Sequence, residues 1–141
     1  MGVPTPEKPP SAPIHGAMTR VVVVDDSFAV RSMLRTVLLV RGYDVLEAAD
    51  GQEALAAAIV RDDVVLLDVM MPGIDGFQVL RSLRARGEDA PQVIMLTAKA
   101  GDGDRAQALA HGAAGYLTKP FDPDDVVAMI ERAVTVPVAP V

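Results

Sequence analysis

The sequence predicts an α/β domain in which helices cover both faces of a parallel, five-stranded sheet. Short apolar runs alternate five times with amphipathic segments, and such strict alternation is typical of parallel sheets. The runs VVVV and VVLL are apolar without interruption, as expected of parallel strands buried on both faces. The chain has 141 residues, 50% of them hydrophobic, which suffices for one domain with its own core.

The first two strand–helix units are predicted before residue 62. Strand 21–24 consists of four valines, and helix 27–41 follows it and ends at Gly42. The apolar stripe of this helix is formed by Val30, Met33, Leu34, Val37 and Leu38. Strand 43–48 comes next, followed by helix 52–61. The inward-facing positions predicted for that helix are Leu55, Ala58 and Ile59.

The third and fourth units occupy the middle of the chain. Strand 64–67 ends at Asp68, and a Met-Pro-Gly turn then leads into helix 76–86. The apolar face of that helix carries Phe77, Leu80 and Leu83. Strand 92–96 follows, and the next segment, rich in alanine and glycine, is predicted to form a short helix at 104–111.

The fifth unit completes the predicted domain, which spans residues 18–135. It consists of strand 115–118 and helix 123–135, whose inward face carries Val126, Val127, Ile130, Ala133 and Val134. Residues 1–17 contain five prolines and are expected to form a flexible leader. Residues 136–141 contain two more and are expected to be irregular or to begin a linker.

Composition restricts the function classes. The chain has no cysteine, so disulfides and thiolate metal sites are excluded. Its net charge of −6 argues against direct binding to nucleic acid or to anionic membranes. No apolar run reaches the roughly 18 residues of a membrane span, and the start lacks the apolar core of a signal peptide. We therefore expect a cytoplasmic protein.

Polar residues gather at the ends of the predicted strands. Asp25 and Asp26 follow the first strand, Asp68 the third, Thr97 the fourth and Lys119 the fifth. Right-handed crossovers bring the carboxyl ends of parallel strands to one edge of the sheet, where ligands bind. Three carboxylates so close together need a cation or take up protons. An all-oxygen donor set favours Mg²⁺, Mn²⁺ or Ca²⁺, with Lys119 and Thr97 suited to a phosphate group.

Each of these residues also has a simpler explanation. Asp26 alone is explained equally well as the N-cap of the following helix, and Asp68 could cap a turn. Lys119 could extend its stem along the end of the strand, and Thr97 could be an ordinary strand residue. Since such residues recur at four strand ends on one edge, a shared site is favoured over four separate explanations.

The motifs at these strand ends resemble the response-regulator receiver domains of bacterial two-component signalling. The matching segments are VVVVDDS, LLDVMMPGIDGF, VIMLTAKA and GYLTKPFDPDD, and the resemblance extends over residues 19–135. It implies a flavodoxin-like (βα)5 fold with the strand order 2-1-3-4-5. It also implies a signalling switch rather than an enzyme, since the domain catalyses only its own phosphorylation and dephosphorylation.

The resemblance assigns roles at the phosphorylation site. Asp68 corresponds to the aspartate that accepts a phosphoryl group from a sensor histidine kinase or a phosphotransfer protein. Asp25, Asp26, Asp68 and the backbone carbonyl of Met70 correspond to the ligands of Mg²⁺, with Mn²⁺ as a substitute. The side chains of Met70 and Lys99 occupy positions that tune the lifetime of the phosphoryl group.

Further roles concern the response to phosphorylation. Thr97 and Lys119 correspond to residues that contact the phosphoryl group, and the bond between Lys119 and Pro120 to a cis peptide. Tyr116 corresponds to an aromatic switch that turns inward when Thr97 moves; without the resemblance, it would be interpreted as a half-buried strand residue. The responding surface is the fourth helix, fifth strand and fifth helix, at about 104–134. It would bind a downstream protein or a second copy of the chain.

Other functions remain open from the sequence. A phosphatase of the haloacid-dehalogenase type also uses an aspartate nucleophile and Mg²⁺, but it places two aspartates one residue apart, whereas Asp25 and Asp26 are adjacent. A receiver that no longer accepts phosphate would act as an interaction module. The chain is either a stand-alone receiver or a fragment of a longer DNA-binding regulator with a fused output domain.

Overall fold

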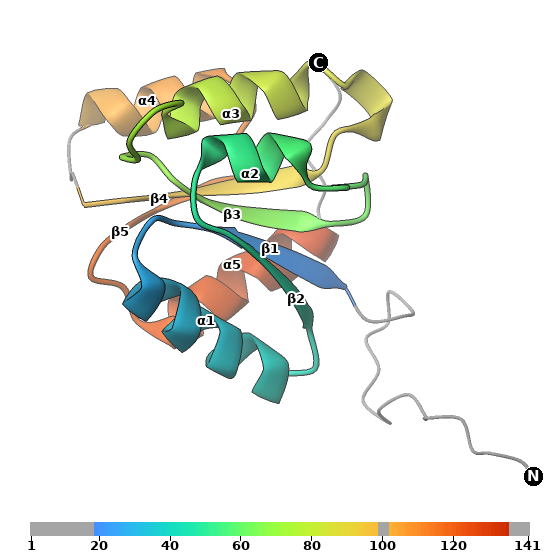
Figure 1. The fold of residues 1–141 in the computed structure, drawn as a ribbon, viewed down its shortest axis with the longest axis vertical. Helices are drawn as coiled ribbons and strands as arrows, with labels where there is room; N and C mark the ends of the chain where they lie inside the picture. Colours follow the sequence, from blue (N-terminus) through green and yellow to red (C-terminus); the bar gives the residue numbers. More distant parts are fainter. Residues whose placement is uncertain (1–18, 99–101, 136–141) are drawn as a thin grey trace, which may run out of the picture.

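A computed structural model describes residues 19–98 and 102–135 of the chain (Figure 1). The predicted leader, the predicted tail and Lys99 lie outside these residues. The sheet has five parallel strands in the order β2-β1-β3-β4-β5, which confirms the predicted fold class and strand order. The strands are β1 (Arg20–Val24), β2 (Asp44–Ala48), β3 (Val64–Asp68), β4 (Gln92–Thr97) and β5 (Gly115–Thr118).

Helices form a layer on each face of the sheet (Figure 1). One layer contains α1 (Phe28–Val40) and α5 (Pro123–Thr135). The other contains α2 (Gly51–Ala56), α3 (Gly76–Arg84) and α4 (Asp102–Ala110), with a short 3-10 helix at Gly87–Asp89 after α3. No helix in the described part of the chain is long and apolar enough to cross a membrane.

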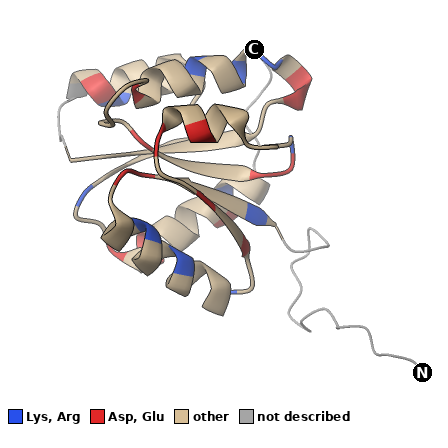
Figure 2. Cartoon of the chain, in the orientation of Figure 1, with Lys and Arg blue, Asp and Glu red and all other residues tan. Residues whose placement is uncertain are grey.

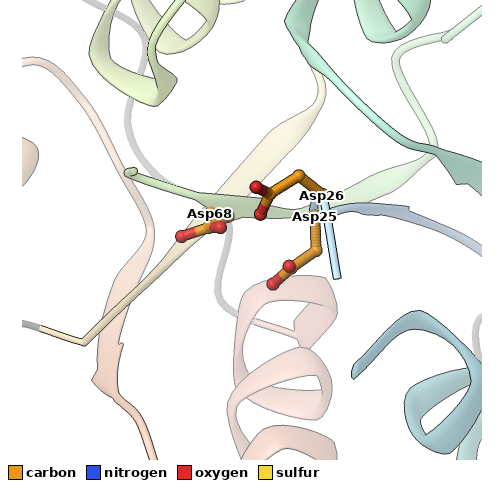
Figure 3. A group of neighbouring side chains, drawn as sticks. All are labelled: Asp25, Asp26 and Asp68. Atoms are coloured by element: carbon orange, nitrogen blue, oxygen red, sulfur yellow. The ribbon is translucent and has the colours of Figure 1, made fainter. Parts of the chain in front are cut away.

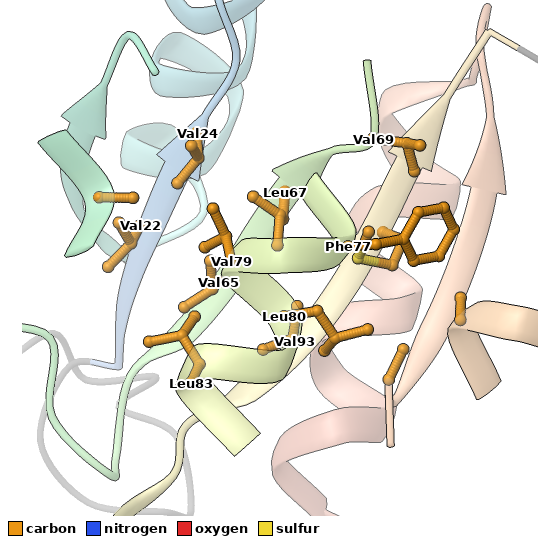
Figure 4. Packing of buried hydrophobic residues seen from close by; sticks show 14 of the residues in the cluster. Val22, Val24, Val65, Leu67, Val69, Phe77, Val79, Leu80, Leu83 and Val93 are labelled. Carbon is orange, nitrogen blue, oxygen red and sulfur yellow. The ribbon is translucent and has the colours of Figure 1, made fainter. Parts of the chain in front are cut away.

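The valine run of β1 lies at the centre and contributes to both cores. Val22 and Val24 face α2 and α3, whereas Val21 and Val23 face α1 and α5, because successive strand residues point to opposite faces. All four are fully buried. Figure 4 shows the first core, where α3 packs on β1, β3 and β4. Burial of each valine contributes roughly 1.5 kcal/mol, so this strand holds the carboxylates that follow it firmly in place.

The helix predicted at 52–61 is wrong beyond residue 56. The backbone of Ala57 is extended, and Ala58, which was predicted to face inward, is exposed. Arginines from other elements bind the carbonyl groups of this connection: Arg20 donates to Ala58 at 2.8 Å and Arg86 to Ile59 at 2.7 Å. These long-range hydrogen bonds hold an extended segment where the local pattern favours a helix.

Candidate functional site

Three carboxylates meet at the carboxyl edge of the sheet. Asp25 and Asp26 follow β1 and Asp68 ends β3, and each offers an oxygen within 4.8 Å of the others (Figure 3). Asp25 and Asp68 are buried, whereas Asp26 is exposed. Figure 2 shows acidic residues on the loops that follow β1 and β3, and basic residues on α1 and α3. The three aspartates offer only oxygen ligands, so they fit a hard divalent cation such as Mg²⁺.

Asp25 is held at every polar atom. Its backbone N–H donates to the carbonyl of Ala48 at 3.1 Å, continuing the ladder between β1 and β2. Its carbonyl accepts a hydrogen bond from Arg31 Nη1 at 2.8 Å. Its carboxylate accepts from the Ser27 backbone N–H at 2.9 Å and from Lys119 Nζ at 2.7 Å. The orientation of Asp25 is therefore fixed by the protein itself.

Asp26 differs from its neighbour. The N-cap of α1 is Ser27, whose hydroxyl accepts from the Val30 backbone N–H at 3.2 Å, so the alternative explanation of Asp26 as that cap is wrong. No donor among the described residues contacts the Asp26 carboxylate. Both its oxygens therefore remain available at the surface of the site.

Asp68 is a buried acid with a perturbed pKa. It is 3% exposed, and burial, followed by repulsion from Asp25, raises its pKa to about 6. Lys119 and a hydrogen bond from the Met70 backbone N–H, which measures 3.1 Å to Asp68 Oδ1, oppose this increase. At pH 7 Asp68 is therefore mostly ionised.

Lys119 bridges two of the acids. Its ammonium lies 2.7 Å from Asp25 and 3.6 Å from Asp68, so its closest acidic partner in the structure is Asp25. The Lys119–Pro120 peptide bond is cis, and the Lys119 backbone N–H donates to the carbonyl of Thr97 at 2.6 Å. These contacts connect β5 to the ends of β1 and β4.

Thr97 and Tyr116 lie together beside the acids. Thr97 is fully buried at the end of β4, and Tyr116, on β5, is 8% exposed and shares a hydrogen bond with it. Burial, and then the nearby carboxylate of Asp104, raise the pKa of Tyr116 above its ordinary value. Tyr116 is thus largely buried, and it lies between Thr97 at the carboxyl edge of the sheet and Asp104 of α4.

Sequence reasoning missed one group of site residues. The end of β2 had suggested no role, yet Glu47 accepts a hydrogen bond from Arg31 Nε at 3.1 Å, and Arg31 in turn binds the carbonyl of Asp25. One signal was available. Arg31 lies one turn after the N-cap Ser27, close to the acid pair, and outside the apolar stripe of its helix.

Comparison with known proteins identifies the family. The family model described as a response regulator receiver domain matches residues 21–131. The chain belongs to this family. Receiver domains are the signalling domains of two-component systems and not classical enzymes, and they bind Mg²⁺ at an acidic pocket.

Individual relatives agree with this assignment. The receiver domain is 47% identical over 110 residues to the response regulator MprA of Mycolicibacterium vanbaalenii, covering 77% of this chain and 47% of the relative. It is 41% identical over 120 residues to the transcriptional regulatory protein ResD of Bacillus subtilis, covering 82% and 49%. The chemotaxis response regulator CheY4 of Vibrio cholerae superposes with a TM-score of 0.75 at 37% identity, covering 82% and 98%. The chain spans about half the length of the curated relatives that it matches.

Proposed function

We propose that this receiver domain is a phosphorylation switch in which Asp68 accepts a phosphoryl group from a sensor histidine kinase or a phosphotransfer protein. The observation that carries the proposal is the charge balance at the sheet edge. Three clustered carboxylates and one ammonium sum to −2, which a divalent cation neutralises. The site then suits an incoming phosphoryl group, which a bare acid cluster would repel.

The metal site proposed here uses the oxygens of the chain itself. Asp25, Asp26, Asp68 and the backbone carbonyl of Met70 would hold Mg²⁺, for which Mn²⁺ could substitute. The bound ion would supply positive charge that offsets the negative charge of the carboxylates and of the phosphoryl group. Asp26 supports this assignment best, since its carboxylate is exposed and accepts no hydrogen bond within the described residues.

The transfer step needs positioning more than acid–base chemistry. A carboxylate oxygen of Asp68 attacks phosphorus, the phosphorus–nitrogen bond to the donor histidine breaks, and the nitrogen keeps the electron pair. Lys119, with three N–H donors, turns one of them toward the new phosphoryl oxygens. The Thr97 hydroxyl donates a hydrogen bond to the same group. Asp68 enters the reaction mostly ionised, because its pKa is about 6.

The response is proposed to pass through Thr97 and Tyr116. A new hydrogen bond from the Thr97 hydroxyl to the phosphoryl group would alter the hydrogen bond that this hydroxyl shares with Tyr116. Thr97 ends β4, and Tyr116 lies on β5 near Asp104 of α4. This hydrogen-bonded pair therefore connects the reacting atoms with the α4–β5–α5 surface. This surface would bind a downstream protein, a fused output domain or, after phosphorylation, a second copy of the chain.

The wider context is also proposed. The receiver unit would span residues 18–135, with the leader and the tail outside it. A cytoplasmic location follows from a kinase partner that uses ATP. Relatives about twice as long, one of them the transcriptional regulatory protein ResD, favour a fused output domain in the whole protein. The acidic receiver itself would then leave DNA contact to that domain.

The decisive experiment is intact-mass analysis after incubation with a small-molecule phosphodonor, with and without Mg²⁺. We expect a single phosphoryl adduct that requires Mg²⁺ and is absent from Asp68→Asn. The matched control is Asp62→Asn, an exposed acid that precedes the opposite end of β3, and it should be phosphorylated like the wild type.

The same experiment separates the alternatives. Sustained release of phosphate over many turnovers would support a phosphatase-like hydrolase. An absence of any adduct with a donor that phosphorylates a reference receiver would contradict the switch and favour a non-phosphorylated interaction module. An adduct that persists in Asp68→Asn would show that another residue is the acceptor.

A further inference from the structure

Arg31 makes three contacts at the start of α1 that tie this helix to the acid pair. Its Nη1 donates to the backbone carbonyl of Asp25 at 2.8 Å, and its Nε donates to Glu47 Oε1 at 3.1 Å. Its guanidinium also lies 5.7 Å from the ring centre of the exposed Phe28, within the range of a cation–π contact. The side chain is only 15% exposed, so these contacts are sheltered from water.

The carbonyl that Arg31 binds belongs to the peptide unit between Asp25 and Asp26. Because a peptide unit is planar, holding its oxygen fixes the direction in which the Asp26 Cα leaves. Asp26 has no side-chain partner among the described residues, so its aim depends on its backbone. Arg31 is therefore placed to orient a carboxylate that it does not touch.

The fork of the guanidinium suits this task. Glu47 holds Nε while Nη1 reaches the carbonyl, so the two hydrogen bonds run from one rigid plane to β2 and to the loop after β1. Arg35 is a natural comparison. It also pairs with Glu47, at 3.4 Å, but its side chain is 51% exposed and no contact joins it to Asp25.

We propose that Arg31 is a positioning residue: braced by Glu47, it fixes the peptide plane between Asp25 and Asp26 and so aims the Asp26 carboxylate into the metal site. The metal-binding part rests on the proposed function. The positioning part concerns the chain alone and can be tested without metal.

Charge and position predict opposite results for the loss of Arg31. If Arg31 acted only as a nearby positive charge, its removal would strengthen cation binding, because like charges repel. If it positions Asp26, its removal weakens binding, as is found when residues that orient metal ligands are replaced. The sign of the change therefore separates the two roles.

The test is the Mg²⁺ affinity of the whole chain measured by isothermal titration calorimetry. We expect Arg31→Ala to weaken binding about tenfold. Arg31→Lys keeps the charge but loses the fork, so it should restore only part of the affinity. The control Arg35→Ala should stay within about twofold of the wild type, since surface charges contribute little. Unchanged or tighter binding in Arg31→Ala would overturn the proposal.

A second measurement uses metal-free protein and also tests whether the variants are folded. Backbone amide NMR signals of Asp26 and Ser27 should shift or broaden in Arg31→Ala and not in Arg35→Ala, while urea unfolding shows that both variants are folded. Unmoved signals would overturn the positioning role. If the wild type binds no Mg²⁺ while these signals do shift, the proposed function fails and the positioning role stands.

Discussion

Gly76 controls how closely α3 approaches the strand that carries Asp68, and replacing it with alanine tests the geometry of the site. This glycine begins α3, and its backbone N–H donates to the carbonyl of Val69 at 3.0 Å. A Cβ atom here would collide with the carbonyl oxygen of Asp68 and lie 2.7 Å from the Cα of Val69. Both obstacles are backbone atoms, so no side chain can rotate away.

The magnitude follows from these contacts. Ordinary Cβ contacts begin near 3.4 Å, so either the first turn of α3 or the end of β3 has to move by a large part of an ångström. Overpacking in a well-packed core costs about 1–3 kcal/mol, and a clash with backbone atoms of two consecutive residues belongs at the upper end. We therefore expect Gly76→Ala to lower the free energy of unfolding by about 3 kcal/mol.

The assay is urea unfolding followed by circular dichroism, paired with Mg²⁺ titration of the folded protein. Gly103→Ala is the control, because this α4 glycine has no atom within 4 Å of the added Cβ and alanine favours a helix. It should stay within about 1 kcal/mol of the wild type, on the stabilising side. If Gly76→Ala is as stable as Gly103→Ala and binds Mg²⁺ normally, the close approach of α3 to Asp68 is not what positions this acid.

Two further predictions concern groups away from the acid cluster. The buried carboxylate of Asp63 accepts hydrogen bonds from Arg20 at 2.7 and 3.1 Å and from the Val60 backbone N–H at 2.8 Å. Asp63→Ala should lower the free energy of unfolding, measured with urea, by about 2 kcal/mol, a moderate loss because water partly solvates Arg20. Phosphorylation should be unchanged, and a large loss of phosphorylation in the folded variant would contradict this prediction. In Tyr43→Phe, which leaves Tyr116 as the only tyrosine, phenolate absorbance should titrate above pH 10 in the folded protein. Burial favours the neutral phenol, so the contribution of Tyr116 to stability is present below pH 10 and is lost as the pH rises through the pKa of the folded state. A titration midpoint of the folded protein at or below that of the urea-unfolded protein would refute the burial of this phenol.

Local pattern was sufficient wherever one element determines its own structure. The valine run predicted β1, and the apolar stripe from Val30 to Leu38 predicted α1, because burial of such a stripe sets both the type and the face of an element. The alternation of elements then placed the acids, since parallel strands end on a common edge. The clustering of Asp25, Asp26 and Asp68 follows from topology alone.

Contacts between distant residues could not be predicted in the same way. The end of α2 depends on Arg20 and Arg86, which bind the connection after it from 38 and 27 residues away. Lys119 lies closest to Asp25, 94 residues earlier, and farther from Asp68, whereas the sequence offers three aspartates for one ammonium. Choosing among them needs distances, because each pairing satisfies charge equally well. The hydrogen bond between Arg31 and Glu47 was likewise missed, because it joins residues of two different elements.

The geometry explains why two adjacent acids follow the most apolar strand. A carboxylate that accepts hydrogen bonds from Ser27 and Lys119 is fixed in direction, and it meets a cation with only the lone pairs that these donors leave free. An exposed carboxylate such as Asp26 keeps its oxygens available, but it cannot anchor the turn that carries it. One aspartate cannot meet both requirements in full, since the lone pairs that anchor the turn are not offered to the cation. Asp25, which directly follows the rigid valine strand, anchors the turn through its buried contacts. The fixed backbone then holds Asp26 in place at the surface of the site.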